Sequence, residues 1–450
     1  MAVEELVGPA PKGWKYKTLG EACKDGGGDI QTGPFGSQLH ASDYVPVGVP
    51  SIMPQNIGDN RIIEDGIARI TPEDARRLSR YLVRRGDIVY SRRGNVERRA
   101  LVGHHEDGWL CGTGCIRVRL GENGADPRYA SYYLGHPVVR EWIVRHAHGA
   151  TMPNLNTSIL AACPFLEPPL AEQRAIAHIL GTLDDKIELN RKQNETLEAM
   201  ARALFKAWFV DFEPVRAKME GRWRRGENLP GLPAHLYDLF PDRLVESELG
   251  EIPEGWEVIS VDTEFDITMG QSPPGSTYND IGEGLPFYQG RADFEFRFPK
   301  RRVFCTAPTR LAKIGDTLVS VRAPVGDINM ALEDCAIGRG VAAVRHKTGS
   351  RSYTYHFMSS ISDVFARFDA EGTVFGSIGK KDFHSISHIK PPRDLVLTYE
   401  KLAANLDDEV EKNEQESRTL AALRDNLLPK LISGELRVKD AEAFLKERGL

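Results

Sequence analysis

The sequence predicts an α+β fold in which two mixed α/β domains accompany two long helices of the coiled-coil type. Three observations support this prediction. A central segment repeats near the end of the chain, both copies have the apolar spacing of a coiled coil, and the region before each copy is rich in Gly and Pro with short β-type runs. A chain of 450 residues is also too long for one ordinary core, which favours two or more domains.

The internal repeat links positions 223 residues apart and needs no gap over about 55 residues. Chance is a poor explanation for such a match, so each half consists of a variable globular part followed by a nearly fixed helical part. A looser match lies upstream, where the pattern G-D-x₃-S-x-R occurs at Gly86–Arg93 and at Gly315–Arg322 with an offset of 229. The matched positions of the main repeat are Gly149 with Gly372, Pro168-Pro169 with Pro391-Pro392, Leu183-Asp184-Asp185 with Leu406-Asp407-Asp408, and Glu188, Asn190, Leu197 and Leu204 with Glu411, Asn413, Leu420 and Leu427.

Each copy of the repeat contains a seam of residues whose spacing alternates between four and three, the coiled-coil period of about 3.5 residues. The first helix should begin near Ala171-Glu172, because Pro favours the first turn of a helix and disfavours its interior. Running to about residue 208, it would be roughly 55 Å long at ~1.5 Å per residue. The two seams are Ile176, Leu180, Leu183, Ile187, Asn190, Asn194, Leu197, Ala201, Leu204 and Trp208, and Tyr399, Ala403, Leu406, Val410, Asn413, Ser417, Leu420, Arg424, Leu427 and Leu431.

Both seams become polar at the same place, Asn190-Asn194 in one copy and Asn413-Ser417 in the other. A buried polar seam position costs stability but fixes register and partner. The simplest arrangement is an antiparallel pair within one chain, with pseudo-twofold symmetry placing one globular domain near each end. Helices buried in a domain and a coil between two chains are the alternatives. Asp184-Asp185 is not read as a catalytic pair, because adjacent helical residues point apart; a solvated face or a partner contact is the better interpretation.

The globular parts, residues 1–170 and 251–393, are expected to be mixed α+β with long loops, where recognition is usually carried. The expected strands include Asp87–Ser91, Cys115–Arg119, Thr317–Val321 and Val341–Val344, and Pro127–His146 is expected to be helical. Arg92, Arg93, Asn95, Arg98 and Arg99 follow the first Gly-Asp strand, Arg322 follows the second, and Tyr288, Gln289 and Arg291 precede the second. Such side chains can contact phosphates, guanine or adenine.

A Gly-led segment precedes each long helix, Gly149–Asn154 in the first half and Gly372–Ser377 in the second. Asn156 or Thr157 is placed to cap a short helix there. Lys380 and Lys381 occupy the equivalent place in the copy. A helix start beside Lys suits a phosphate, and a plain turn fits equally well.

The net charge is −6, but the basic residues are concentrated in two patches. Residues 76–99 hold nine Arg against two acids, and residues 291–322 hold eight basic residues against three acids. Residues 400–427, in contrast, hold four basic residues against eight acids. One Arg run alone is equally consistent with a solvated face. Two patches, one in each half, favour a nucleic-acid partner.

Motifs of catalysis are missing from the sequence. There is no G-x₄-G-K-[ST] or G-x-G-x-x-G loop, His105-Glu106 has no second His for a zinc motif, and no [ND]-P-P-[YF] tetrapeptide of amino-methyltransferases occurs. Cys111 and Cys115 form a lone C-x₃-C without a second pair, which argues against zinc. Scattered Cys, the absence of a signal peptide and the absence of an apolar span favour a cytoplasmic protein away from membranes.

Several segments closely resemble the conserved regions of type I restriction-modification specificity subunits. Pro168–Ile176, Leu183–Ile187, Asn190 and Leu204–Pro214 resemble the central conserved region of that family. Leu249–Trp256 resembles the entry into its second recognition domain, and Asn426–Leu436 resembles its C-terminal conserved region. One departure is Asp394–Tyr399, which differs from the Ala-Glu-Gln-Arg start of the first helix and makes docking on the second helix less secure.

The resemblance implies a DNA sequence-specificity subunit that binds a bipartite, asymmetric site on double-stranded DNA and directs adenine methylation and restriction by other subunits. Two methyltransferase subunits would dock on the coils, which act as a ruler between the half-sites. The methyltransferase subunits would carry S-adenosylmethionine, and restriction (translocase-nuclease) subunits would carry ATP and Mg. This chain would bind no cofactor or metal and would not be an enzyme. A scaffold that does not touch DNA and a nuclease with an unrecognised site are the alternatives.

These inferences give a domain division and two sets of candidate residues. The domains are 1–170 (target-recognition domain 1), 171–210 (central coiled-coil helix), 211–250 (linker), 251–393 (target-recognition domain 2), 394–436 (C-terminal coiled-coil helix) and 437–450 (tail). The candidate DNA-binding residues are Arg92, Arg93, Asn95, Arg98, Arg99, Asn154, Gln289, Arg291, Arg322, Lys380 and Lys381. The candidate methyltransferase-docking residues are Asp184, Asp185, Lys186, Asn190, Asp407, Asp408 and Asn413.

Overall fold

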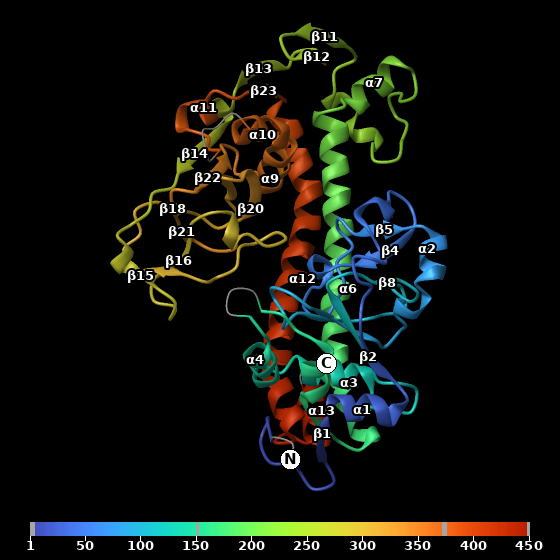
Figure 1. Cartoon of the computed structure of the whole chain (residues 1–450). Coiled ribbons are helices and arrows are strands. Elements are labelled where there is room, and N and C mark those ends of the chain that lie inside the picture. Colours follow the sequence, from blue (N-terminus) through green and yellow to red (C-terminus); the bar gives the residue numbers. More distant parts are fainter. Residues whose placement is uncertain (1–4, 150–152, 371–375, 448–450) are drawn as a thin grey trace. The chain divides into compact units, whose positions relative to one another are not determined.

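The computed structural model describes residues 5–149, 153–370 and 376–447. These residues form two compact units that each contain helices and strands (Figure 1). The first unit combines Met1–Leu189 with Glu416–Leu450, and the second consists of Asn190–Gln415. The α+β class expected from the sequence is therefore confirmed.

The described part of the first unit contains three β-sheets. Its strands are β1 (Lys15–Thr18), β2 (Asp29–Thr32), β3 (Tyr44–Val45), β4 (Val49–Ile52), β5 (Ala68–Ile70), β6 (Ile88–Ser91), β7 (Arg99–Leu101), β8 (Leu110–Cys111), β9 (Cys115–Arg119) and β10 (Pro164–Glu167). The strand orders are β1-β10, β2-β9-β6-β7 and β3-β5-β4-β8.

The short helices of the first unit begin at polar caps. Thr18 and Glu21 form a capping box at the start of α1, in which each side chain accepts a backbone N–H of the other residue. Asn156 caps α5, as the sequence predicted, and Lys380 begins the equivalent helix α11 of the second unit. The expected helical run 127–146 is two helices. The helices are α1 (Leu19–Gly26), α2 (Pro72–Arg77), α3 (Pro127–Leu134), α4 (Pro137–His146), α5 (Thr157–Ala162) and α13 (Val438–Glu447), with 3₁₀ turns η1 (Ala41–Asp43), η2 (Pro54–Asn56) and η3 (Ser79–Tyr81).

The second unit has its own sheets and short helices. Its strands are β11 (Leu244–Ser247), β12 (Gly250–Pro253), β13 (Glu257–Ser260), β14 (Phe265–Met269), β15 (Tyr278–Asn279), β16 (Leu285–Tyr288), β17 (Phe304–Cys305), β18 (Leu311–Ala312), β19 (Thr317–Val321), β20 (Val325–Met330), β21 (Cys335–Ile337), β22 (Val341–His346) and β23 (Ser387–Lys390). Its helices are α7 (Glu213–Met219), α8 (Val261–Glu264), α9 (Arg351–Ser360), α10 (Ser362–Ala370) and α11 (Lys380–His384), with 3₁₀ turns η4 (Ala234–Leu239), η5 (Gly275–Thr277) and η6 (Arg291–Asp293).

The sheets of the two units share one topology. The order β2-β9-β6-β7 of the first unit corresponds to β14-β22-β19-β20 of the second, and β3-β5-β4-β8 corresponds to β15-β17-β16-β21, to which β18 is added. The pairs β1-β10 and β13-β23 correspond as well. The loose upstream match in the sequence is therefore a repeat of the fold, with loops of different length that change the offset between the copies.

Two long helices, α6 (Leu170–Phe209) and α12 (Arg393–Ser433), lie side by side and contribute to both units (Figure 1). In the second unit, the Tyr399 hydroxyl donates to the carbonyl of Ala201 at 3.1 Å. In the first unit, Arg424 pairs with Asp184 at 2.7 Å. Residue numbers thus rise along α6 as they fall along α12, which confirms the predicted antiparallel pairing within one chain.

The predicted seams are largely buried in the two hydrophobic cores, and so is the polar step within them. Burial of this apolar stripe is the main stabilising contribution of the pair, at about 25 cal/mol per Å² of apolar surface. The buried seam residues are Ile176, Leu180, Leu183, Asn190, Asn194, Ala201 and Trp208 on α6, and Tyr399, Ala403, Val410, Asn413, Leu420, Leu427 and Leu431 on α12.

Residues expected to be a linker and a tail belong to the packed units. Trp223, Leu236 and Phe240 of the segment 211–250 are buried in the same cluster as Trp208. The segment therefore extends the core of the second unit. Ala441 of α13 is likewise buried in the first unit's core. The bulky aromatic side chains around Trp223 are the sequence signal for this packing.

The remaining sequence expectations concern membranes and cysteines. None of the described helices is both long and apolar enough to cross a membrane.

All six Cys are buried thiols without a disulfide. Burial raises the pKa of Cys111 to about 12, and the Cys115 thiol donates to the carbonyl of Ile52. The C-x₃-C pair is thus part of the core of the first unit.

Candidate nucleic-acid interface

Loops from separate parts of the first unit meet beside the end of β6, and we call residues 33–38, 52–53, 91–93, 112–114 and 153–155 the first loop cluster. The Arg92 N–H donates to the carbonyl of Gly114 at 2.8 Å, and the Leu155 N–H donates to the carbonyl of Arg92 at 2.8 Å. The Gly112 N–H donates to the carbonyl of Ile52 at 2.9 Å. Arg93 and Asn154 form a β-bridge. Backbone hydrogen bonds therefore fix the positions of these loops.

The second unit repeats this arrangement in the second loop cluster, residues 270–272, 288–289, 321–322, 338–340 and 376–378. The Val321 N–H donates to Gly340 at 2.9 Å, and the Ile378 N–H donates to Val321 at 3.1 Å. The Gly338 N–H donates to Tyr288 at 2.8 Å, and Arg322 forms the β-bridge with Ser377. Each of these backbone hydrogen bonds and the β-bridge has a counterpart in the first loop cluster. We call this shared set of backbone contacts the backbone frame of a cluster.

Each cluster has two glycines that flank one residue, Gly112 and Gly114 in the first and Gly338 and Gly340 in the second, and one glycine of each pair lies close against the backbone of another loop. A Cβ on Gly112 would lie 2.6 Å from the carbonyl oxygen of Ile52, and one on Gly340 would lie 2.2 Å from that of Gln289. These approaches exclude any side chain. The residues between the glycines, Thr113 and Arg339, are consequently held at the crossing of the loops.

The aspartate of the G-D-x₃-S-x-R pattern has a structural role in both units. Asp87 accepts the Arg84 N–H at 2.7 Å and the Arg119 guanidinium at 2.6 Å. Asp316 accepts the Lys313 N–H at 2.7 Å and pairs with Arg345 at 2.7 Å. The aspartate thus ties a turn to the neighbouring strand, and the arginine at the end of the pattern points outward.

Four exposed arginines without an anionic partner lie at or next to these clusters. In the part of the chain that the structure describes, Arg93, Arg98, Arg322 and Arg339 are exposed and have no carboxylate within 4.0 Å. Uncompensated arginines raise the local positive potential, which attracts a polyanion such as DNA. The charge therefore supports a phosphate-binding surface on each unit.

The other candidate DNA-binding residues occupy varied positions. Arg92 is half-buried, with its guanidinium 5.9 Å from the ring centre of the exposed Phe35. Asn154 is half-buried, Arg291 pairs with Asp327 at 2.6 Å, and Gln289 is exposed beside it. Asn95, Lys380 and Lys381 are exposed. Residues 150–152 and 371–375 of the two Gly-led segments lie outside the described residues.

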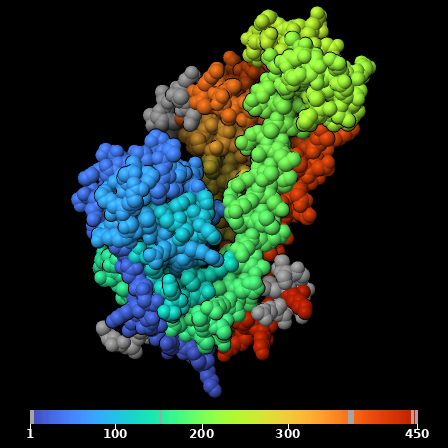
Figure 2. Space-filling view, turned by 90° about the vertical axis from the view of Figure 1, so that its right-hand side faces the viewer, coloured from blue at the N-terminus to red at the C-terminus, as the bar shows by residue number. Residues whose placement is uncertain are grey.

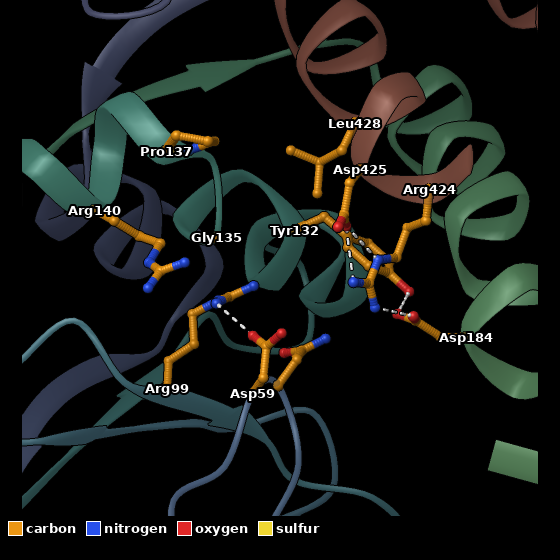
Figure 3. Close-up of a pocket in the computed structure, with 11 residues that line it drawn as sticks. Asp59, Arg99, Tyr132, Gly135, Pro137, Arg140, Asp184, Arg424, Asp425 and Leu428 are labelled. Atoms are coloured by element: carbon orange, nitrogen blue, oxygen red, sulfur yellow. Dashed lines mark hydrogen bonds and ion pairs between the residues drawn. The ribbon is translucent and has the colours of Figure 1, made fainter. Parts of the chain in front are cut away.

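Arg99 differs from the other candidates because its side chain is directed into the first unit. It is 5% exposed, and its Nε donates to the carbonyl of Ser131 at 2.6 Å. It lines a polar cavity of about 250 Å³ together with Asp59 and Asp184 (Figure 3). Burial, as the largest cause, lowers the pKa of Arg99. Its position suits packing of α3 against β7.

The candidate docking residues fall into buried and exposed groups. Asp184 accepts the Tyr132 hydroxyl at 2.5 Å, Asp407 is bound by Arg297, and Asn190 and Asn413 lie between the helices. Lys186 pairs with Glu416 at 3.1 Å. The exposed members are Asp185 and Asp408, whose side chains are 67% and 63% exposed. Residues of α6 form part of the molecular surface in the view of Figure 2.

Asp185 and Asp408 occupy equivalent positions in the repeat. Arg128 of α3 binds Asp185, and Arg351 of α9 binds Asp408. Each arginine is 223 residues from its counterpart, as is each aspartate. The main repeat therefore extends upstream to Arg128, well before its first matched position in the sequence, Gly149.

One buried cluster in the second unit has the donor set of a metal site. Single donor atoms of Glu198, His356 and Asp407 lie within 4.8 Å of one another. Arg297 already binds both carboxylates, with a distance of 2.7 Å to Glu198. Burial, followed by the charges of Arg297 and Arg202, lowers the pKa of His356 to about 3. The guanidinium therefore supplies the positive charge that this site needs.

The sequence prediction missed Thr113 and Arg339. Their signal was present: Gly112-x-Gly114 with Val118-Arg119 recurs as Gly338-x-Gly340 with Val344-Arg345 at an offset of 226. This offset differs from the 223 of the main repeat and from the 229 of the upstream match. The glycine motif therefore does not align with either of them.

Comparisons with known proteins agree with this architecture. A family model described as type I restriction modification DNA specificity domain matches residues 11–199. The putative type I restriction enzyme MjaX specificity subunit of Methanocaldococcus jannaschii is 29% identical, with 96% of each chain covered. The HindI specificity subunit of Haemophilus influenzae is 25% identical over 86% of this chain and 95% of that protein. The chain is thus similar, along most of its length, to specificity subunits of type I restriction-modification systems.

A solved structure supports the fold of the chain. The type I restriction-modification S subunit from M. genitalium matches with a TM-score of 0.53 and 15% identity, covering 96% of this chain and 99% of that one. The matched family model is a DNA specificity domain and the relatives are named specificity subunits, in agreement with the predicted role. The sequence prediction of family and role is therefore confirmed.

Proposed function

We propose that the two loop clusters each bind one half of a bipartite, asymmetric site on double-stranded DNA, and that the specificity subunit thereby directs adenine methylation and restriction by partner subunits. One observation carries the asymmetry. The clusters share a backbone frame, yet Thr113 stands where the other has Arg339, and Asn154 where the other has Ser377. Equal frames with different side chains suit two half-sites of different sequence.

The chemistry of the exposed residues suits the two kinds of contact that DNA recognition needs. Arg93 and Arg322 are placed to neutralise phosphates, which supplies affinity without sequence preference. Gln289 and Asn154 carry amides that can pair with adenine edges. Lys380 and Lys381 add positive charge beside the second cluster.

Two methyltransferase subunits are proposed to dock on the coil helices. The support is the equivalence of Asp185 and Asp408, which gives two copies of one partner the same exposed carboxylate. Those subunits would carry S-adenosylmethionine, and restriction (translocase-nuclease) subunits would carry ATP and Mg. The specificity subunit itself would hold no cofactor and would act in the cytoplasm.

The docking proposal is tested by charge reversal and co-purification. Asp185→Lys or Asp408→Lys should each leave one methyltransferase subunit in the complex, and the double variant should leave none. Glu409→Lys, on the same helix as Asp408 but pointing elsewhere, is the matched control. Two bound methyltransferase subunits in the double variant would contradict the docking site.

The function itself is tested with the assembled methyltransferase complex. Sequencing of methylated DNA should reveal adenine methylation at one bipartite, asymmetric motif, and DNA affinity should fall steeply with salt. A complex that binds no DNA would instead indicate a scaffold protein. Cleavage or methylation by the isolated chain would indicate an unrecognised active site.

A further inference from the structure

Arg339 is fixed by its backbone at the centre of the second loop cluster. Its neighbour Gly338 donates to Tyr288, and its other neighbour Gly340 accepts from Val321. Its own N–H donates to the Ser272 hydroxyl at 3.4 Å. The strands β16 and β19, which end at these partners, thus hold the backbone of Arg339 from two sides.

The side chain of Arg339 has no competing use within the described chain. It is exposed, and no described carboxylate lies within 4.0 Å of it. Arg291, in contrast, is paired with Asp327, and Arg301 with Glu333. A guanidinium with a rigid backbone and no partner is available for a ligand with planar acceptors.

The two loop clusters share one arginine position and differ at another. Arg322 has the equivalent Arg93 at the same place in the first frame, so both clusters present it whatever sequence they face. Arg339 has the equivalent Thr113, which uses its hydroxyl to bind the carbonyl of Pro34 at 3.1 Å. DNA phosphates are alike in every sequence, whereas base edges differ. The shared arginine suits phosphate, and the differing residue suits a base.

We infer that Arg339 reads a G·C base pair in the half-site bound by the second unit, through a bidentate contact of its guanidinium with the O6 and N7 atoms of guanine. The inference rests on the proposed function and adds to it the residue that sets one position of the target. Thr113 makes no such contact in the first half-site. The difference between Arg339 and Thr113 then accounts for part of the asymmetry of the whole site.

The test uses the assembled methyltransferase complex and duplexes in which each base pair of the recognised motif is changed in turn. Arg339→Ala should remove discrimination at one G·C pair of the second half-site, by roughly ten- to a hundred-fold, and leave all other positions unchanged. Arg339→Lys should discriminate less than the wild type, because lysine lacks the bidentate fork. Arg322→Ala should weaken binding to all duplexes equally.

Controls separate the possible failures. Arg224→Ala, an exposed arginine of the same unit outside the cluster, should leave both affinity and discrimination unchanged. If Arg339→Ala weakens all duplexes equally or keeps full discrimination, Arg339 does not read a base. If the wild-type complex itself shows no sequence preference, the proposed function fails instead. Arg339→Gln repeats the test if the alanine variant does not assemble.

Discussion

The side-chain amide of Asn190 donates to the backbone carbonyl of Asn413 at 3.4 Å, and the two residues are each other's counterpart in the repeat. Asn413 in turn donates to Asn194 at 2.9 Å. Side-chain amides of both helices are therefore hydrogen-bonded across this step of the seam, which discourages a shift of one helix along the other.

Asn413→Leu should destabilise the second unit by about 1–3 kcal/mol, because it leaves the buried Asn194 carbonyl without its donor. Replacing Asn194 and Asn413 together by Leu should recover much of this loss, since both partners are then apolar. Urea unfolding followed by fluorescence of the buried Trp208 measures both effects. Asn405→Leu, at an exposed position of α12, is the control and should change stability by less than about 0.5 kcal/mol. Equal stability of Asn413→Leu and the wild type would contradict the role of the polar step.

The sequence alone was sufficient to predict the elements with a regular pattern of apolar residues. The seams of α6 and α12 were found because burial repeats at helical spacing, and Asn190 and Asn413 stood out because they interrupt it. The strands Cys115–Arg119 and Thr317–Val321 were predicted with the bounds that the structure has. Such local patterns depend only on residues that are close together in the chain. They can therefore be recognised in a single sequence.

Contacts between distant segments were beyond such prediction. Arg297 lies in a basic run whose charge suggested a nucleic-acid partner or a solvated face, but 99 residues separate it from its partner Glu198. Arg99 belongs to a similar run, yet its side chain is buried beside α3. The chemistry of an arginine does not reveal whether it faces solvent or a carboxylate from another part of the fold.

Arg297→Met should destabilise the second unit by about 3–5 kcal/mol, because it leaves Glu198 and Asp407 as buried carboxylates without their cation. Arg424→Met in the first unit should cost less, since Asp184 is partly exposed and keeps the Tyr132 hydroxyl. Urea unfolding of the two variants gives the comparison. Adding Glu198→Gln and Asp407→Asn to Arg297→Met should restore part of the loss, and a failure to do so would show that packing rather than charge dominates.

The buried Glu264 predicts a dependence of stability on pH. Burial raises its pKa, but the hydrogen bonds and charges of His346 and His388 outweigh this effect and lower the pKa to about 2. A depressed carboxyl pKa adds stability above its unfolded value near ~4.3 and loses it as the pH falls toward the folded value. The stability gap between wild type and Glu264→Gln should therefore be largest above pH ~5 and shrink toward pH ~2. A gap that is constant between pH ~3 and pH ~6 in urea unfolding would exclude this linkage.

Arg93 and Arg99 should respond in opposite ways to substitution by Ala. Arg93 is exposed without a carboxylate partner in the described chain, so Arg93→Ala should change stability by less than about 0.5 kcal/mol and reduce the slope of log affinity against log salt by about one. Arg99→Ala removes the donor to the Ser131 carbonyl and should cost about 1–3 kcal/mol, with the salt slope unchanged. Urea unfolding and salt titration of DNA binding by the assembled complex measure both quantities. If Arg99→Ala lowers the slope and keeps its stability, then Arg99 contacts DNA, as its place in the basic run first suggested, and its guanidinium must leave the cavity beside α3 to do so.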